Sequence, residues 1–388
     1  MKIVCFRPAW AMLAVLWTHL ACAENPSSAL GGSANAQRWP ARQANDWYAK
    51  QSWLVGANFV PSSAVNQLEM WQAETFDPAT IDRELGYAEG IGMNTMRVFL
   101  HDIAWREDPE GFLSRVNKYL EIADAHGIKT MFVIFDGVWH PNPKAGLQPV
   151  PVPGLHNSGW VQSPGREYLQ SSDKQDQLKS YVMALLTRFG KDQRVLAWDL
   201  FNEPDNPNRQ AYGRDGTRIE LDEPEKEKLA MQLLEKTFTW FRQANPSQPA
   251  TCGVWRGDYL THPNPIQRLQ LECSDIITFH NYDEPGELRK QIEGLKKFGR
   301  PVLCSEYMAR GNRSTFADNL PVLKQYRVAA WSWGLVNGKS NTIYPWDSWK
   351  KTYAAEPAVW FHDVFRADGT PFSKTETDLI RQLTGRGK

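Results

Sequence analysis

The stretch VLAWDLFNEPDNPN, residues 195–208, begins as a run of apolar residues and ends in a polar turn. Its first residues are typical of a strand that is covered on both faces, as the strands of a parallel sheet are. Asn202 and Glu203 follow where that strand runs out, and Pro204 and Pro207 mark the turn. A single glutamate at a strand end is as typical of an ordinary loop as of a catalytic site. The meaning of Glu203 therefore depends on what the other strands carry.

Strand-like and helix-like segments alternate along the rest of the chain. The predicted strands are Trp53–Asn58, Asn94–Leu100, Thr130–Asp136, Val195–Phe201, Ala250–Trp255, Ile276–His280, Pro301–Glu306 and Val328–Trp333. The predicted helices are Ile81–Ile91, Phe112–Ala125, Lys174–Phe189, Glu225–Ala244, Pro285–Phe298, Phe316–Tyr326 and about Lys374–Leu383. This alternation predicts an α/β protein, a single-domain (β/α)₈ TIM barrel over residues 46–388. An open doubly wound sheet would have a glycine-rich phosphate loop after its first strand, and VGANFVPSS at 55–63 is not one.

Composition and charge narrow the classes of partner. The 388 residues are 42% hydrophobic, and 44 Lys and Arg balance 44 Asp and Glu. A chain without net charge gives no indication of binding to nucleic acid or to an anionic membrane. The 17 Trp and 12 Tyr are numerous, and flat aromatic rings suit stacking on the faces of sugars as well as filling a core.

The N-terminus has the pattern of an export signal. Positive charge precedes the apolar run Ala11–Leu20, and a small-residue cleavage site ends at Ala23. We therefore expect a signal peptide at residues 1–23 and a periplasmic or secreted protein. The run is too short to span a membrane, and a lipid anchor at Cys22 fits the preceding residues poorly. Residues 24–45 are small and polar, which predicts a flexible N-terminal segment.

Cysteine and histidine spacing gives no indication of a metal. After the predicted cleavage Cys252, Cys273 and Cys304 remain, and their spacing is not that of metal ligands. With three thiols at most one disulfide forms, and buried free thiols on neighbouring strands are the expected state. No His-x-His pair occurs, so a metal-dependent barrel hydrolase is a weak alternative and no cofactor is expected.

Polar and aromatic residues recur where the predicted strands end. They are Arg97 near the end of strand two, Trp139 and His140 after strand three, Asn202 and Glu203 after strand four, His280 at the end of strand six with Tyr282 just beyond it, Glu306 at the end of strand seven, and Trp331 and Trp333 on strand eight. In a barrel these ends meet at one rim, and strands four and seven face each other across it. Two carboxylates in an aromatic cleft suit glycosidic bond cleavage, in which one is protonated and the other is ionised.

These motifs resemble those of the clan A glycoside hydrolases, most closely family 5, which includes cellulases and mannanases. NEP at 202–204 resembles the acid/base motif on strand four, and SEY at 305–307 resembles the nucleophile motif on strand seven. Arg97, the His-x-Tyr pair at 280 and 282, and a Trp ending strand eight match by position. The resemblance covers about residues 46–384.

The resemblance implies a role for each of five residues. Glu306 would attack the anomeric carbon, while Glu203 would protonate the leaving group and then deprotonate water. This implies retention of configuration and carboxyl groups ~5–5.5 Å apart. Asn202 would bind the sugar 2-hydroxyl, and Arg97 would keep Glu306 ionised. Tyr282 would donate a hydrogen bond to that carboxylate.

The other rim residues are candidates for binding the sugar. His280 is expected to contact either the sugar or a catalytic carboxylate. Trp331 and Trp333 share one face of strand eight, and at least one should lie under the reacting sugar. Further candidates near the rim are Trp139, His140, Trp160, Trp255, Trp346 and Trp349. Strand three departs from the family pattern, because FDGVWH replaces an expected histidine with Asp136 followed four residues later by His140.

The sequence therefore predicts a retaining β-glycoside hydrolase that acts on β-linked oligo- or polysaccharides without a cofactor. The alternative is a carbohydrate-binding protein on the same barrel that does not cleave its ligand. The connections 137–170 and 334–372 could close one end of the cleft for exo action or line an open groove for endo action. The sugar, its linkage and the oligomeric state are not readable from the residues.

Overall fold

The computed structural model describes residues 38–213, 216–219 and 225–386. The expected signal peptide at 1–23 lies outside these residues, as does most of the expected flexible segment. Among the described residues, no helix is long and apolar enough to cross a membrane.

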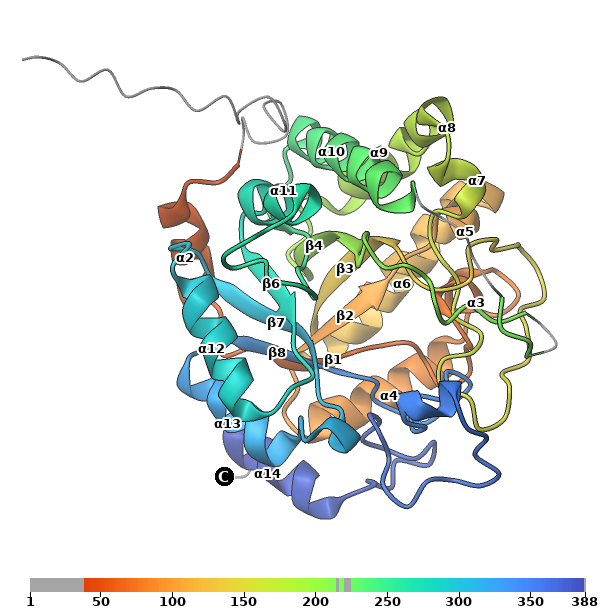
Figure 1. The fold of residues 1–388 in the computed structure, drawn as a ribbon, viewed down its shortest axis with the longest axis vertical. Coiled ribbons are helices and arrows are strands. Elements are labelled where there is room, and N and C mark those ends of the chain that lie inside the picture. The colour runs from red at the N-terminus through yellow and green to blue at the C-terminus, as the bar shows by residue number, and fades with distance from the viewer. Residues whose placement is uncertain (1–37, 214–215, 220–224, 387–388) are drawn as a thin grey trace, which may run out of the picture.

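The strands form one parallel sheet that curls into a barrel (Figure 1). They are β1 (Val55–Asn58), β2 (Thr95–Phe99), β3 (Lys129–Asp136), β4 (Val195–Asn202), β5 (Ala250–Thr251), β6 (Ile277–His280), β7 (Val302–Tyr307) and β8 (Ala329–Trp333). The order is β5-β4-β3-β2-β1-β8-β7-β6, so β1 pairs with β8. A parallel bridge from Val254 to Phe279 joins the two remaining edges. The predicted (β/α)₈ TIM barrel is confirmed.

Helices surround the barrel, and most of them follow a strand. They are α2 (Ala41–Ala49), α3 (Gln67–Trp71), α4 (Pro78–Gly90), α5 (Asp102–Glu107), α6 (Pro109–Ala125), α7 (Arg166–Leu169), α8 (Ser172–Gln177), α9 (Lys179–Phe189), α10 (Lys226–Ala244), α11 (Pro265–Cys273), α12 (Pro285–Lys296), α13 (Phe316–Gln325) and α14 (Lys374–Thr384), with short 3₁₀ turns η1 (Arg310–Asn312) and η2 (Trp346–Trp349).

The sequence reasoning missed α11, although the chain carries a clear signal for its start. Asn264 accepts a hydrogen bond from the Gln267 backbone N–H, and the Gln267 side chain accepts one from the Asn264 N–H. This reciprocal pair is a capping box, with Pro265 at the first helical position. An asparagine, a proline and a glutamine at this spacing therefore predict a helix that the apolar pattern alone did not reveal.

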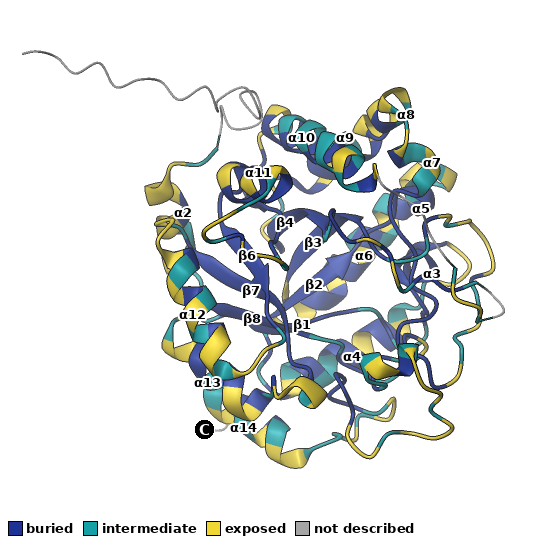
Figure 2. Cartoon of the chain, viewed as in Figure 1, coloured by how far each residue is buried: buried dark blue, intermediate teal, exposed yellow. Residues whose placement is uncertain are grey.

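Burial follows the layers of the barrel (Figure 2). Every residue of β4 is buried, as expected for a strand with the barrel interior on one face and helices on the other. A large apolar cluster fills the space between strands and helices, and a smaller one lies at the starts of the strands.

Helix α2 covers that smaller cluster and corrects the expected flexible segment. Ala44 is fully buried in it, with Trp39 and Trp47 packed alongside. Arg38 donates hydrogen bonds to the carbonyl oxygens of Ser274 and Leu271 at 2.7 Å each. The prediction of a flexible chain through residue 45 is therefore wrong for residues 38–45, which pack on the barrel.

The three cysteines in the described part of the chain, Cys252, Cys273 and Cys304, are free and buried. Cys304 lies on β7 and Cys252 directly follows β5, whereas Cys273 ends helix α11 rather than lying on a strand. The expectation of buried thiols is confirmed, with this change of place for Cys273.

Candidate active site

The turn that follows β4 points two consecutive side chains toward one pocket. Along a strand, successive side chains face opposite sides. Glu203 leaves this pattern with a backbone φ of 42°, in the left-handed region that non-glycine residues seldom adopt. Both Asn202 and Glu203 consequently line a pocket of about 500 Å³ at the carboxyl ends of the strands. A strained backbone at this point is typical of functional sites.

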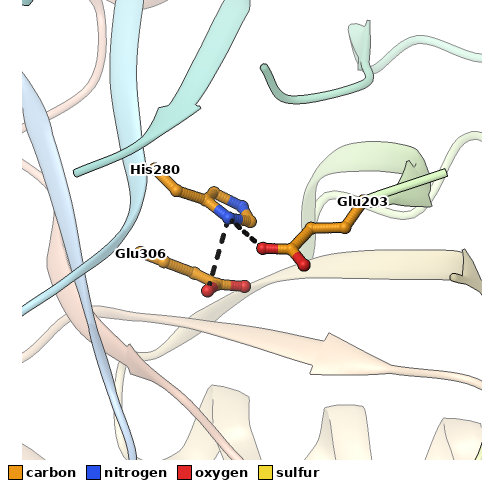
Figure 3. A group of neighbouring side chains, drawn as sticks. All are labelled: Glu203, His280 and Glu306. Carbon is orange, nitrogen blue, oxygen red and sulfur yellow. Dashed lines mark hydrogen bonds and ion pairs between the residues drawn. The ribbon is translucent and has the colours of Figure 1, made fainter. Parts of the chain in front are cut away.

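His280 lies between the two glutamates (Figure 3). Its Nδ1 is 3.0 Å from Glu203 Oε1 and 3.4 Å from Glu306 Oε2. One oxygen of each carboxylate and a ring nitrogen of His280 all lie within 4.8 Å of one another. The parallel pairing of β6 with β7 shifts by one residue here, so that His280 stands opposite Glu306. Such bulges re-aim side chains beside active sites.

Arg97 and Tyr282 hold the Glu306 carboxylate. Arg97, fully buried, donates from Nη1 to Glu306 Oε1 at 2.9 Å. The Tyr282 hydroxyl donates to Glu306 Oε2 at 2.8 Å. Each oxygen of Glu306 thus accepts a separate hydrogen bond, and the guanidinium charge favours the ionised form. The contacts expected for Arg97 and Tyr282 are present.

Arg97 has further partners that the sequence reasoning did not name. It donates to Asp199 Oδ2 at 2.7 Å and to Asn58 Oδ1 at 2.8 Å. Asp199 lies on β4 and is fully buried, so its charge compensates the guanidinium. Asp199 and Asn202 both lie on β4. A charged residue inside an otherwise apolar strand was the signal in the sequence that could have identified Asp199 as a partner of Arg97.

Asn202 is held from two sides. Its Oδ1 accepts a hydrogen bond from Arg97 Nη2 at 2.8 Å, and its Nδ2 donates to Asp136 Oδ1 at 2.9 Å. Rotating the amide by half a turn would oppose donor to donor at Arg97 and acceptor to acceptor at Asp136. The amide orientation is therefore fixed, with one N–H left to donate to a ligand.

Burial raises the pKa of both glutamates, and their different partners decide how each one is protonated. Burial, with the Asp205 charge nearby, raises the pKa of Glu203 to about 7, although the hydrogen bond from Asn206 opposes the shift. Burial also raises the pKa of Glu306, while His280 and Arg97 act to lower it. Glu203 lacks a direct bond to Arg97, so it is the carboxyl that holds a proton near neutral pH.

Two neighbouring titratable groups, His280 and Tyr282, are neutral at this pH. Burial lowers the pKa of His280 to about 4, so the ring is uncharged near neutral pH. Burial and the Glu306 charge raise the pKa of Tyr282, which keeps its hydroxyl as a donor. A neutral His280 carries one N–H, and its position favours donation from Nδ1 to Glu203 Oε1.

Asn206 and Asp205, whose roles the motif alone did not reveal, support the turn. Asn206 Nδ2 donates to Glu203 Oε2 at 2.6 Å. Asp205 accepts from Trp255 Nε1 at 2.6 Å and from Arg256 Nε at 2.9 Å. The NEPDN sequence is thus a complete local unit, in which each polar side chain has a partner.

Trp331 and Trp333 differ in depth along strand β8. Trp333 lines the pocket and packs edge-on to Phe99 and Trp160, with ring centroids 5.8 Å away in both cases. Trp331 is fully buried in the cluster at the strand starts, together with Leu54. The inclusion of Trp331 among the substrate-binding candidates is therefore wrong, because two residues along the strand lowers the ring to the barrel floor.

Four further tryptophans line the pocket, namely Trp139, Trp255, Trp346 and Trp349. Trp346 and Trp349 stack at an interplanar angle of 6° because residues three apart in a 3₁₀ turn eclipse one another. Trp160 is buried and donates to Asp136 Oδ2 at 2.6 Å, so it supports the site from behind.

His140 does not reach this pocket. It lines a separate hollow of about 430 Å³ beside Lys144 and Gln148. Its Nδ1 accepts a hydrogen bond from the Asn142 backbone N–H at 3.2 Å, which turns the ring toward its own loop. His140 is therefore not one of the residues that line this pocket, and its role in substrate binding stays a prediction. The buried Asp136 lies at the end of β3 instead.

Glu203, His280 and Glu306 are also the one cluster among the described residues with atoms close enough to hold a metal ion. The arrangement suits an acid–base pair better than a cation. Arg97 places a positive charge 2.9 Å from Glu306, and Tyr282 occupies its other oxygen. The expectation that no cofactor is needed stays a prediction.

A family comparison identifies the chain. The model of the family described as Cellulase (glycosyl hydrolase family 5) matches residues 63–352. The chain belongs to glycosyl hydrolase family 5. It is accordingly a glycosidase that acts on O-glycosyl bonds, as the paired glutamates indicated. No curated protein sequence matches it.

Solved structures with the same fold include several family 5 proteins. A GH5_18 protein from Streptomyces cattleya in complex with GlcNAc superposes with a TM-score of 0.55 at 13% identity, over 86% of this chain and 80% of that one. The endo-β-1,4-mannanase from Thermotoga petrophila gives 0.54 at 14%, over 87% and 77%. The exo-β-1,4-mannosidase Op5Man5 from Opitutaceae bacterium strain TAV5 gives 0.54 at 17%, over 86% and 60%. At these identities the likeness shows the fold.

Proposed function

We propose that this family 5 glycosidase is a retaining β-glycoside hydrolase that cleaves β-linked oligo- or polysaccharides by double displacement. The observation that carries the proposal is the approach of the Glu203 and Glu306 carboxylates, with oxygens inside the 4.8 Å cluster. Retaining enzymes hold their carboxyl groups about 5–5.5 Å apart, whereas inverting ones leave about 6.5–9.5 Å for a water.

The chemistry follows from the surroundings of each glutamate. Glu306, held by Arg97 and Tyr282, attacks the anomeric carbon and forms a glycosyl ester as the glycosidic C–O bond breaks. Glu203 transfers its proton to the leaving oxygen in the same step. Water then attacks the anomeric carbon and gives a proton to Glu203, while the bond from that carbon to Glu306 breaks and the carboxylate leaves. The sugar is released with its original configuration.

Other residues of the pocket are placed to bind the reacting sugar. Trp333 provides an apolar face under the reacting ring, and Asn202 keeps one N–H toward the pocket. A sugar 2-hydroxyl that accepts this N–H is bound more strongly as charge develops at the anomeric carbon. We also propose that the protein is exported, on the strength of its N-terminal sequence pattern.

The substitutions Glu203→Gln and Glu306→Gln test the assignment of the two glutamates. Each should lower kcat/KM on natural β-glycosides by at least about 1,000-fold, because each removes a group that acts only in the transition state. Thermal unfolding and circular dichroism should show an intact fold. Glu110→Gln, at an exposed glutamate, serves as the control. Near-wild-type turnover in either variant would contradict the proposal.

A panel of soluble β-glucan, β-mannan and β-xylan oligosaccharides tests the substrate and the stereochemistry together. We expect hydrolysis of at least one series, with the β-anomer appearing first in the NMR spectrum. Appearance of the α-anomer first would indicate inversion. A carbohydrate-binding protein without activity would release no product from any series.

A further inference from the structure

The two catalytic glutamates divide the mouth of the barrel. Glu203 follows β4 and Glu306 lies on β7, so β5 and β6 stand on one side and β8, β1, β2 and β3 on the other. Trp333 at the end of β8 places the reacting sugar on the second side. The leaving group, which takes the proton of Glu203, then lies on the β5 side, where Trp255 and Arg256 line the pocket.

On the side of the reacting sugar, the loop after β3 is joined to the loop after β8. The His156 backbone N–H donates to Ser348 Oγ at 3.0 Å, and the indole N–H of Trp349 donates to the His156 carbonyl at 3.1 Å. The buried His156 ring makes a further hydrogen bond from Nδ1 to the Tyr344 carbonyl at 2.8 Å. These bonds connect the two long connections that Figure 1 draws side by side, in yellow and blue.

Two more hydrogen bonds and a ring contact extend this junction. The Asn157 N–H donates to the Ser340 carbonyl at 3.0 Å, and Asn341 Nδ2 donates to the Val152 carbonyl at 2.9 Å. The Trp139 ring meets the Trp349 ring edge-on, with centroids 5.8 Å apart. The junction therefore runs from the pocket wall outward to the loop surface.

The loop after β1 fills the space below the junction. The Ser62 carbonyl accepts from the Lys339 N–H at 3.1 Å, and Lys339 Nζ forms an ion pair with Glu69 at 2.8 Å. Asn66 Nδ2 donates to the Gly159 carbonyl at 2.8 Å. The loops after β1, β3 and β8 are thus bound to one another in all three pairs.

Among the described residues, the loops after β1 and β8 leave only a hollow of about 20 Å³ between them, beside Val60 and Trp333, which is too small for a sugar ring. A Cβ built on Gly338 would lie 2.3 Å from the Ser62 Cα, so the two backbones are in contact. None of the described residues that line the pocket belongs to the loops after β1 or β2. His156, Asn157 and Trp349 line it instead, and they form its end wall. The space for the sugar chain therefore ends shortly beyond Trp333.

We propose that the protein is exo-acting and removes one sugar at a time from the non-reducing end of β-linked oligosaccharides. This inference rests on the proposed hydrolase function and adds which bond is cleaved. The terminal sugar occupies the space between Trp333 and the end wall, and the rest of the chain leaves past Trp255 on the open side. The bond that breaks is the first glycosidic bond, which Glu203 protonates and Glu306 attacks.

A pair of substrates that differ only at the non-reducing end tests this inference. The pair consists of β-1,4-linked hexose tetrasaccharides labelled with 2-aminobenzamide at the reducing end, either free or closed by a 4,6-O-benzylidene group at the other end. We expect the free substrate to shorten by one sugar at a time and the closed one to react at least about 100-fold more slowly.

The outcomes separate the two proposals. Similar rates for both substrates, or release of labelled disaccharide before trisaccharide, would overturn exo action while leaving the hydrolase function in place. Failure to cleave any β-linked series in the panel would contradict the hydrolase function, and exo action with it.

A loop variant tests whether the junction itself closes the pocket. Ser348→Ala combined with Asn341→Asp removes two hydrogen bonds of the junction without changing a residue that lines the pocket. Asp tolerates the positive φ of position 341. We expect the rate ratio of closed to free substrate to rise at least about fivefold. Lys351→Ala, an exposed change in the same loop, is the control, and an unchanged ratio in the double variant would contradict the role of the junction.

Discussion

Single side chains around the pocket explain why two buried glutamates of the same type behave differently. Glu306 has a guanidinium and a phenol as partners, and these stabilise a negative charge. Glu203 has Asn206 and a neutral His280, which bind it without supplying a full positive charge. Desolvation acts on both, so the difference in partners is the basis for proposing Glu203 as the acid.

The pH dependence of the reaction should report on Glu203. Its pKa is raised to about 7, and the glycosylation step requires the protonated form. Activity on substrates with poor leaving groups should therefore fall as the pH rises through about 7. An aryl glycoside with a dinitrophenol leaving group needs no proton, and its kcat/KM should lack this alkaline limb. An alkaline limb of equal position with both substrates would assign the titration to another group.

Asp136 is the side chain whose contribution is easiest to isolate. It accepts hydrogen bonds from Asn202, Trp160 and Gln67, and it is not itself one of the residues that line the pocket. Asp136→Asn replaces one of two accepting oxygens by an amide donor, which must oppose either the Asn202 amide or the donors of Trp160 and Gln67. A buried unsatisfied group costs about 1–3 kcal/mol, so kcat should fall roughly 10- to 100-fold.

The readout for Asp136→Asn should separate positioning from folding. A 2-deoxy substrate lacks the hydroxyl that Asn202 binds, so the variant should lose little activity on it. Equal losses on the normal and the 2-deoxy substrate would contradict the positioning role, and the melting temperature shows whether the fold is intact.

Among the elements, strand β8 shows how position along a strand separates structure from function. Trp331→Ala should lower the free energy of unfolding by about 3–5 kcal/mol, because the ring is fully buried. Trp333→Ala should lower kcat/KM by more than about tenfold with a much smaller loss of stability, because the ring is half-buried at the pocket. Chemical denaturation and steady-state kinetics on both variants check this. A large loss of stability in Trp333→Ala and a large loss of activity in Trp331→Ala would contradict these roles.

Loops and short helices were the elements least visible in the sequence. All eight strands were predicted within a few residues, although β5 is shorter than expected. A run of apolar residues reveals a strand that is buried on both faces, because few polar side chains can be accommodated on either face. The helices α2, α3, α5, α7 and α11 were not predicted, and the start of α11 is marked by its capping residues rather than by an apolar pattern.

For the molecule as a whole, helix α2 closes the barrel at the end away from the pocket. Ala44→Asp would place a charge in the floor cluster and should lower the free energy of unfolding by at least about 2 kcal/mol. Ala41→Asp, in the exposed first turn of the same helix, should change it by less than about 0.5 kcal/mol. Thermal unfolding of the two variants decides whether residues 38–49 are part of the folded domain, and equal melting temperatures would contradict it.

The barrel fold alone does not decide whether a glycosidase cleaves its substrate in endo or exo fashion. Proteins named as an endo-mannanase and an exo-mannosidase superpose on this chain with the same TM-score of 0.54. The contacts among the loops after β1, β3 and β8 are what give this chain a closed end. A substrate's cleavage point therefore depends on connections that the fold class leaves free to vary.

The amino-acid sequence alone was enough for the barrel, for Glu203 and Glu306, and for Arg97 and Tyr282 beside them. Strand periodicity and order are local properties, and a barrel brings all strand ends to one rim whatever the loops do. Only the folded structure showed that Trp331 is buried below the pocket, that His140 lies in a separate hollow, and that Asp136 holds Asn202 by a hydrogen bond. These depend on how far along a strand or loop a side chain lies from the rim, and on contacts between segments that are distant in the chain. The closed end of the pocket also required the folded structure, because hydrogen bonds between three separate loops form it.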